Sequence, residues 1–321
     1  MSPPLSLPLS SVGEIALLKP LLPRFFQRPD VATGPGDDCA VLRMPGSRRD
    51  LLATTDPVIR NHHFVDDTPL EFVGRKAVAR AISDIAAMGG EAAWILTDVV
   101  APAAFPADSV RALYGALEKA VREFGLSIVG GDLSEGPDLE IHVTALGTVP
   151  RGTAVLRSGA RPGDALFVTG ALGASWTDGN THQYTFRPRL AQGAFLRARG
   201  FASAMMDLSD GLGADLPRLL DASGVSCALK ADAIPLSDAA RRTSDPLAHA
   251  WGDGEDFELL FAVPPDRVAG LLRAWPRRFP DLPISRIGTV LEPGVPRTLS
   301  LAGAKVPLPP GGYNHFRSAS P

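Results

Sequence analysis

Glycine and proline are spread along the whole chain, and this distribution limits the folds that the sequence can adopt. The 321 residues include 32 glycines and 30 prolines, with no collagen-like period. Both residue types interrupt long helices and favour tight turns, which excludes a helical bundle or a coiled coil. The sequence therefore predicts many tight turns between its helices and strands, in a length that suits two ordinary domains.

Hydrophobic periodicity predicts the elements between these turns. Asp108 is a candidate N-cap and Gly125 a stop for one helix, and Pro57 should end regular pairing in one strand. Residues 177–189 have no clear period, so we expect a loop there. Helices are predicted over 13–18, 71–88, 110–124, 212–222 and 265–275, and strands over 51–56, 126–129, 141–146, 165–170, 204–207 and 257–263.

The segment 149–152 is the best candidate for a domain boundary, because strand signals restart after it. We therefore expect an α+β chain with an N-terminal domain over 1–150 and a C-terminal domain over 151–321. Residues 1–10 are rich in proline and serine and are expected to form a loose tail.

Charge and cysteine content exclude several classes of protein. The net charge of −3 gives no strong field for nucleic acid or an anionic membrane. Cys39 and Cys227 are too few for a disulfide framework or a cysteine zinc site. No apolar run approaches the roughly 20 residues that span a bilayer, and the start lacks signal-peptide features. We expect a soluble, cytoplasmic protein.

Carboxylates recur beside glycines or at the ends of predicted strands. A single group of this kind is usually only a turn, because Asp and Gly populate turns. Together the groups indicate a site, in a chain without P-loop, G-x-G-x-x-G, H-E-x-x-H or G-x-S-x-G motifs. They lie at 36–38, 54–56, 130–132, 207–211 and 252–256.

Asp84 strengthens this interpretation, because it lies on the apolar stripe of Ala77, Ala81 and Met88 in a predicted helix. A carboxylate buried there is costly unless it is paired or bound to metal. Only Arg75, Lys76 and Arg80 are near Asp84 in the sequence, and two of them are expected to project elsewhere. Many carboxylates without matching basic residues suggest hard cations with oxygen ligands and point to Mg²⁺. Several magnesium ions indicate polyphosphate chemistry, because the metal neutralises charge on the transferred group.

Eight ordered segments carry a resemblance to a known family. They are GDDCAVL (36–42), TTDPVIRNHHF (54–64), SDIAAMGG (83–90), GGDLSEGP (130–137), LRSGARPGD (156–164), DLSDGLGADL (207–216), GEDFELLF (254–261) and GGYNHF (311–316). This set resembles the thiamine-monophosphate kinase family, in the superfamily of aminoimidazole ribonucleotide synthetase and selenophosphate synthetase. The resemblance implies a homodimer with paired N-terminal sheets, a C-terminal α/β sandwich, and ATP bound by glycine- and aspartate-rich loops.

The resemblance also implies roles for individual residues. Mg²⁺ ligation is implied for Asp37, Thr54, Thr55, Asp56, Asp84, Asp132, Asp207 and Asp210. Nucleotide contact is implied for Tyr114, Gly131, Asp132, Arg157 and Ser209, and thiamine phosphate contact for His63, Glu255 and Tyr313. Catalysis would rest on Asp37, Asp56, Asp84, Asp132, Asp207 and Arg157. The residues alone also allow a surface role for Arg157, a core role for His63, and packing roles for Tyr114 and Tyr313.

Two segments depart from the family pattern. The family usually has Thr where this chain has Leu133, and a long helix where it has residues 175–180. The expected reaction is Mg²⁺- and ATP-dependent phosphorylation of thiamine monophosphate to the diphosphate, without a strong general base. Two alternatives stay open: an ATP-dependent enzyme of the same superfamily with another small acceptor, and a non-catalytic nucleotide-binding protein. No nucleic-acid or membrane partner is expected.

Overall fold

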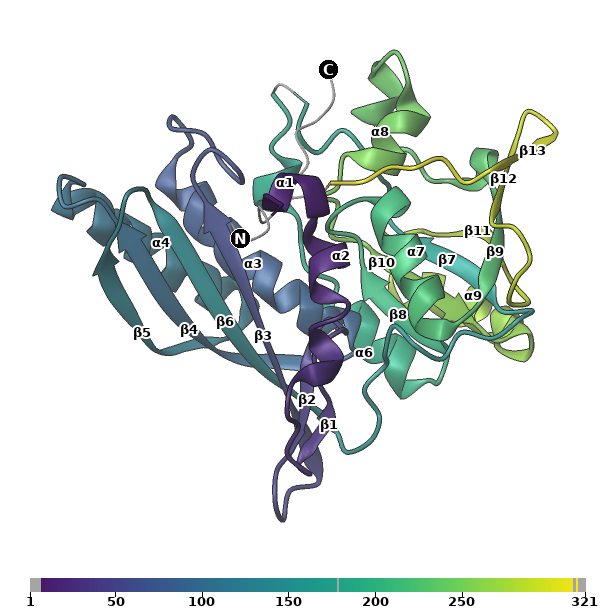
Figure 1. The fold of residues 1–321 in the computed structure, drawn as a ribbon, viewed down its shortest axis with the longest axis horizontal. Coiled ribbons are helices and arrows are strands. Elements are labelled where there is room, and N and C mark those ends of the chain that lie inside the picture. The colour runs from purple at the N-terminus through teal and green to yellow at the C-terminus, as the bar shows by residue number, and fades with distance from the viewer. Residues whose placement is uncertain (1–6, 178, 314–315, 317–321) are drawn as a thin grey trace, which may run out of the picture.

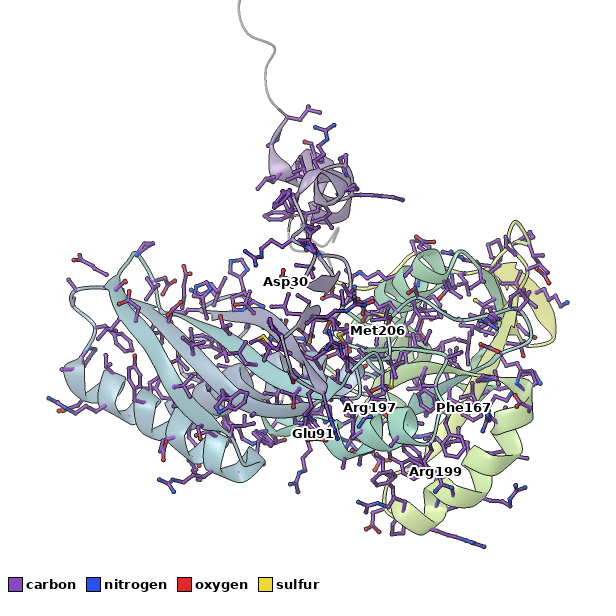
Figure 2. All side chains as sticks on the ribbon, turned by 90° about the horizontal axis from the view of Figure 1, so that it is seen from below. Asp30, Glu91, Phe167, Arg197, Arg199 and Met206 are labelled. Carbon is purple, nitrogen blue, oxygen red and sulfur yellow. The ribbon has the colours of Figure 1, made fainter. Side chains whose placement is uncertain are left out.

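The chain forms two halves, each built on its own sheet (Figure 1). The computed structural model describes residues 7–177, 179–313 and 316. Residues 1–6 of the expected tail and residues 314–315 of the GGYNHF segment lie outside the described residues, as does residue 178. The helices α1 (Leu9–Val12) and α2 (Glu14–Leu18) stand apart from both halves (Figure 2). None of the helices in these ranges is long and apolar enough to cross a lipid bilayer.

The N-terminal half is a six-stranded sheet with two long helices on one face. The helices α3 (Leu70–Ala87) and α4 (Ala107–Phe124) bury an apolar stripe that includes Ala77, Ile85 and Leu117 against the sheet. In spatial order the strands are β1 (Val31–Thr33), β2 (Ala40–Arg43), β3 (Arg49–Ile59), β6 (Glu140–Pro150), β4 (Glu91–Ala101) and β5 (Ser127–Glu135).

Two local predictions in this half are wrong. Pro57 does not end pairing, because it lies opposite His142 and β3 continues to Ile59. The pairing of β2 with β3 stops at Ala40 of β2, which lies opposite Ala53. Pro57 therefore lies where β3 has only one neighbouring strand, and its missing N–H breaks no second ladder. The α4 helix is preceded by Pro106 at the N-cap, and Asp108 instead lies in its first turn. The predicted stop at Gly125 is confirmed, with a left-handed C-cap.

The C-terminal half is an α/β sandwich, as the resemblance implied. Successive residues of β7 (Ala165–Thr169) face opposite layers. Leu166 packs with the layer of α7 (Leu212–Ser223), and Phe167 packs with the layer of α6 (Leu190–Ala198) and α9 (Pro265–Arg278). In spatial order the strands are β13 (Ala304–Pro307), β12 (Thr298–Leu301), β9 (Ser226–Lys230), β11 (Ile284–Leu291), β7 (Ala165–Thr169), β10 (Leu259–Val263) and β8 (Ala204–Asp207).

The helices of this half lie on both faces of the sheet and at its ends. They are α5 (His182–Thr185), α6 (Leu190–Ala198), α7 (Leu212–Ser223), α8 (Pro246–Gly252) and α9 (Pro265–Arg278). Short 3₁₀ turns complete the elements at Leu22–Arg24, Ala231–Ala233 and Ala240–Arg242. The presence of α5 corrects the expectation of a continuous loop over 177–189.

The two halves meet where α6 crosses the end of α3. A Cβ atom added to Gly193 of α6 would lie 2.0 Å from the carbonyl oxygen of Ala86, so only glycine permits this approach. Arg197 of the same helix donates a 2.7 Å hydrogen bond to the carbonyl oxygen of Gly89. Figure 2 shows Arg197 beside Glu91 at this junction. The contact fixes α3, which carries part of the site, against the second half.

This junction can be tested by placing one methyl group in it. We expect Gly193→Ala to lower the free energy of unfolding by about 1–3 kcal/mol, because the close backbone approach cannot accommodate the added carbon. Gly115→Ala is the matched control, since no atom of the described residues outside its own helix turn lies within 4 Å of the position that its Cβ would occupy. That control should gain up to about 1 kcal/mol from helix propensity. Urea unfolding that finds the two variants equally stable would contradict the packing argument.

Candidate active site

Three carboxylates meet between the two halves and form an acidic cluster, defined here as Asp38, Asp84 and Asp207. One oxygen of each lies within 4.8 Å of the others. Asp38 precedes β2, Asp84 lies in α3, and Asp207 ends β8, so both halves contribute. Burial, reinforced by the neighbouring carboxylates, raises the pKa of Asp84 well above its usual range and that of Asp207 to about 8. A cation in the cluster would remove this penalty.

Hydroxyl and guanidinium donors hold the acidic cluster in place. Thr54 donates a hydrogen bond of 2.5 Å to Asp84, and Ser83 donates one of 2.5 Å to Asp207. The Arg157 guanidinium lies 2.7 Å from Oδ1 of Asp38. The other oxygen of Asp38, Oδ2, is buried and accepts no hydrogen bond from the described residues. The cluster therefore keeps an oxygen that a cation could use.

The structure assigns the two neighbouring aspartates of the GDD segment to different tasks. The Asp37 carboxylate, which the sequence favoured as a ligand, accepts backbone N–H groups of Asp38 at 3.0 Å and Arg157 at 3.1 Å. Burial, then the charge of Asp38, raises the pKa of Asp37 to about 6. Asp38 joins the cluster, although sequence reasoning passed over it. Adjacent carboxylates in one turn carry no sequence signal that tells which side chain faces the site.

A second group of charges begins one helical turn from Asp84, at Arg80 of α3. Arg80 contacts Asp56 through Nη2 at 3.1 Å and pairs with Glu255, and the buried Lys76 lies 2.7 Å from the second oxygen of Glu255. The expectation that the carboxylates lack basic partners is therefore wrong for Asp56 and Asp38. The basic partners were missed because they are distant in sequence: Arg80 lies 24 residues from Asp56, and Arg157 lies 119 residues from Asp38.

Asp210 gives a further correction of the same kind. Its carboxylate lies 2.6 Å from the Arg218 guanidinium, which also pairs with the buried Asp215 at 2.6 Å. Burial and the charge of Asp210 raise the pKa of Asp215 to about 7. Asp210, which was predicted to bind a metal ion, is thus paired with the arginine Arg218.

A narrow cavity lies beside this second group of charges, and Arg80 and Glu255 of the group line it. It brings together the predicted thiamine phosphate contacts, His63, Glu255 and Tyr313. Trp176, from the segment that departs from the family pattern, also lines it, and the Lys76 ammonium lies 4.6 Å from the centroid of the Trp176 ring. The narrow cavity is lined by His62, His63, Arg80, Trp176, Ser209, Asp210, Asp253, Glu255 and Tyr313. Trp176, Lys76 and Arg80 had no role predicted from the sequence.

The remaining predicted residues lie away from the acidic cluster. Thr55 is exposed and accepts a 3.4 Å hydrogen bond from Thr144, since its side chain alternates with that of Thr54. Asp132 lies three strand spacings from Pro57 of β3, about 14 Å across the sheet. Tyr114, Gly131 and Asp132 line a separate edge cavity of about 450 Å³, together with Thr97, Ile128, Gly130 and Leu133.

Family models match both halves of the chain. The AIR synthase related protein N-terminal domain matches residues 36–149, and the C-terminal domain of the same description matches residues 187–298. A solved structure described as AaThiL complexed with AMPPCP and TMP has a TM-score of 0.81 and 28% identity, covering 97% of this chain and 100% of that one. Fold and site thus define a protein of the AIR synthase related class.

Individual relatives narrow the class further. The thiamine-monophosphate kinase of Rhodopirellula baltica is 37% identical, over 87% of this chain and 89% of its own. That of Escherichia coli K12 is 34% identical, over 76% and 82%. A crystal structure of the Stenotrophomonas maltophilia kinase has a TM-score of 0.72 and 31% identity, covering 91% of this chain and 98% of that one. The chain belongs to the thiamine-monophosphate kinase family.

Replacing Asp84 tests whether the acidic cluster is strained without a cation. We expect metal-free Asp84→Asn to melt at or above the wild-type temperature at pH 8, because the substitution removes a buried carboxyl group whose raised pKa opposes ionisation. The gain should shrink as the pH falls towards 5, where the native carboxyl group is protonated. Mg²⁺ should stabilise the wild type more than the variant.

The matched control is Asp108→Asn, at an exposed position of α4. It should leave both the pH dependence and the Mg²⁺ response of melting unchanged. An Asp84→Asn protein that melts early at pH 8 and retains the full Mg²⁺ response would contradict this account of the cluster.

Proposed function

We propose that this protein transfers the γ-phosphoryl group of ATP to the phosphate of thiamine monophosphate, giving thiamine diphosphate and ADP. One observation carries the proposal: in a member of this family, both halves supply carboxylates to the acidic cluster, and Arg80, one helical turn from Asp84 in α3, lines the narrow cavity. The relative described with AMPPCP and TMP supports both substrates. The proposed use of ATP by this protein agrees with the predicted cytoplasmic location.

Mg²⁺ is the cation that fits the acidic cluster best. Among the residues that the structure describes, the cluster offers carboxylate oxygens without His or Cys, which suits a hard cation, and the buried Asp38 Oδ2 has no hydrogen-bond donor. We propose Asp38, Asp84 and Asp207 as ligands, with Asp37, Thr54, Asp56 and Asp210 close by. When bound, the metal would neutralise charge on the transferred phosphoryl group. Asp132 would serve a more distant ion or the nucleotide.

The protein's own residues then bind and align the reactants. Arg157 is held by Asp38 and presents a planar guanidinium at the edge of the acidic cluster, which suits a phosphate group. The acceptor is a phosphate monoester with a second pKa of about 6, so it is ionised at neutral pH. No strong general base is required, and the catalytic problem is to hold two anions in line.

The remaining site residues divide between two cavities. We propose that Tyr114, Gly131 and Asp132 contact the nucleotide in the edge cavity, with Ser209 and Arg157 nearer the phosphates. His63, Glu255 and Tyr313 would contact the thiamine phosphate at the narrow cavity, together with Trp176, and this cavity of about 20 Å³ would have to widen to admit it. The division at residue 150 stays a proposal, and it coincides with the end of β6.

A direct assay separates the alternatives. Purified protein with ATP, Mg²⁺ and thiamine monophosphate should yield thiamine diphosphate and ADP in equal amounts, identified by chromatography and mass. Exhaustive chelation should abolish turnover, because the clustered carboxylates cannot hold a phosphate without a cation. ATP consumption only with a different small acceptor would support the superfamily alternative. ATP binding with no turnover of any acceptor would support a non-catalytic role.

We also propose that the protein is a homodimer joined through its N-terminal half. β5 ends its sheet, so one edge of the strand has no neighbour among the described residues (Figure 1). Large apolar side chains are exposed near this edge: Trp94 is 42% exposed, Val129 55% and Leu133 56%. An edge strand with exposed apolar residues favours association over a monomeric state.

Light scattering at micromolar concentration should give about twice 33.8 kDa. Val129→Asp should shift the mass towards the monomer, because it places a charge in the apolar contact. Val295→Asp is the matched control, since Val295 is 42% exposed but lies in the other half. A wild type that remains a monomer and is fully active would refute the dimer proposal.

A further inference from the structure

Arg80 occupies a position that none of the predicted roles explains. It extends from α3 into the narrow cavity, contacts Asp56 on β3 and reaches Glu255 in the C-terminal half. Only 8% of the residue is exposed. Asp84 lies four residues later, so Arg80 and a member of the acidic cluster share one face of the helix.

Lys76 and Arg80 differ in what they can offer a substrate. Lys76 is fully buried, and its ammonium group is used by the His63 carbonyl, Gln183 and Glu255. Arg80 lines the narrow cavity, and three of its five N–H donors bind Asp56 and Glu255. Since Lys76 already compensates Glu255, the charge of Arg80 is balanced chiefly by Asp56. Arg80 is therefore the cation that would become available to a substrate if Asp56 bound another cation.

We infer that Arg80 binds the phosphate of the acceptor and that Asp56 holds this arginine until the site is loaded. The inference rests on the proposed function. Asp56 is also a proposed metal ligand, and a carboxylate that takes a cation is a weaker partner for the guanidinium. The released fork faces a cavity that lies beside the acidic cluster. A planar pair of N–H donors matches two oxygens of a phosphate monoester, which a lysine cannot reproduce.

This role makes Arg80 a specificity-determining residue for a phosphorylated acceptor. Thiamine without its phosphate offers no anion to the fork, so Nε and Nη2 of the buried Arg80 lose their acceptor once Asp56 is engaged elsewhere. The discrimination between thiamine monophosphate and thiamine should therefore depend on Arg80. A purely structural ion pair between the halves would affect stability and leave this discrimination unchanged.

Calorimetric titration with Mg²⁺ and without ATP measures this directly, using thiamine monophosphate and thiamine as the two probes. Arg80→Gln should weaken binding of the monophosphate by about 10- to 100-fold, the loss expected for a charge-assisted hydrogen-bonded pair. Binding of thiamine should change little. Arg80→Lys keeps the charge but loses the fork, so its affinity should lie between those of the wild type and Arg80→Gln.

Asp56→Asn supplies a second measurement that does not require loss of the arginine. It removes the competing carboxylate, so metal-free binding of the monophosphate should become tighter than in the wild type. The double variant with Arg80→Gln should lose that gain. This coupling distinguishes a shared phosphate contact from two independent structural effects.

Arg75→Gln is the matched control, because Arg75 is a largely buried arginine of the same helix that pairs with Glu123. It should lower stability and retain normal binding of both probes. Folded Arg80→Gln and Arg80→Lys proteins that discriminate between the probes as the wild type does would overturn the inference. If the wild type itself forms no thiamine diphosphate, the proposed function fails, which the assay above detects separately.

Discussion

The mutual repulsion of Asp38, Asp84 and Asp207 is the constraint on which the site depends. Three carboxylates within 4.8 Å of one another oppose ionisation, and burial increases that penalty. They come from a turn before β2, from α3 and from β8, so the cluster forms only when the two halves dock. Folding thus creates a place where a cation lowers the free energy, and the chemistry of a phosphoryl transfer enzyme needs that cation.

The helix α3 links this constraint to the rest of the molecule. Lys76, Arg80 and Asp84 recur every four residues and so lie on one face, which is directed towards the site. Close packing against the C-terminal half requires small residues. Gly193 of α6 has no side chain, so this half can approach the end of α3. One element therefore positions a buried cation, an arginine and a carboxylate relative to the C-terminal half.

Local patterns predicted much of the fold and only part of the site. The long helices, most strands and the chemical importance of Asp84 follow from periodicity, because each depends on residues a few positions apart. The choice between Asp37 and Asp38 depends on side-chain direction within one turn. The pairing of Arg80 with Glu255, and the position of Trp176 over Lys76, depend on contacts between distant segments. Such contacts exist only after the halves have docked, so no local pattern encodes them.

The central claim is that the acidic cluster holds the divalent cation that supports phosphoryl transfer. The most direct measurement is anomalous diffraction from crystals grown with Mn²⁺ and a non-hydrolysable ATP analogue. We predict an anomalous peak in coordination contact with oxygens of Asp38, Asp84 and Asp207. Full occupancy of ions elsewhere, with these three carboxylates contacted only by protein donors, would contradict the account.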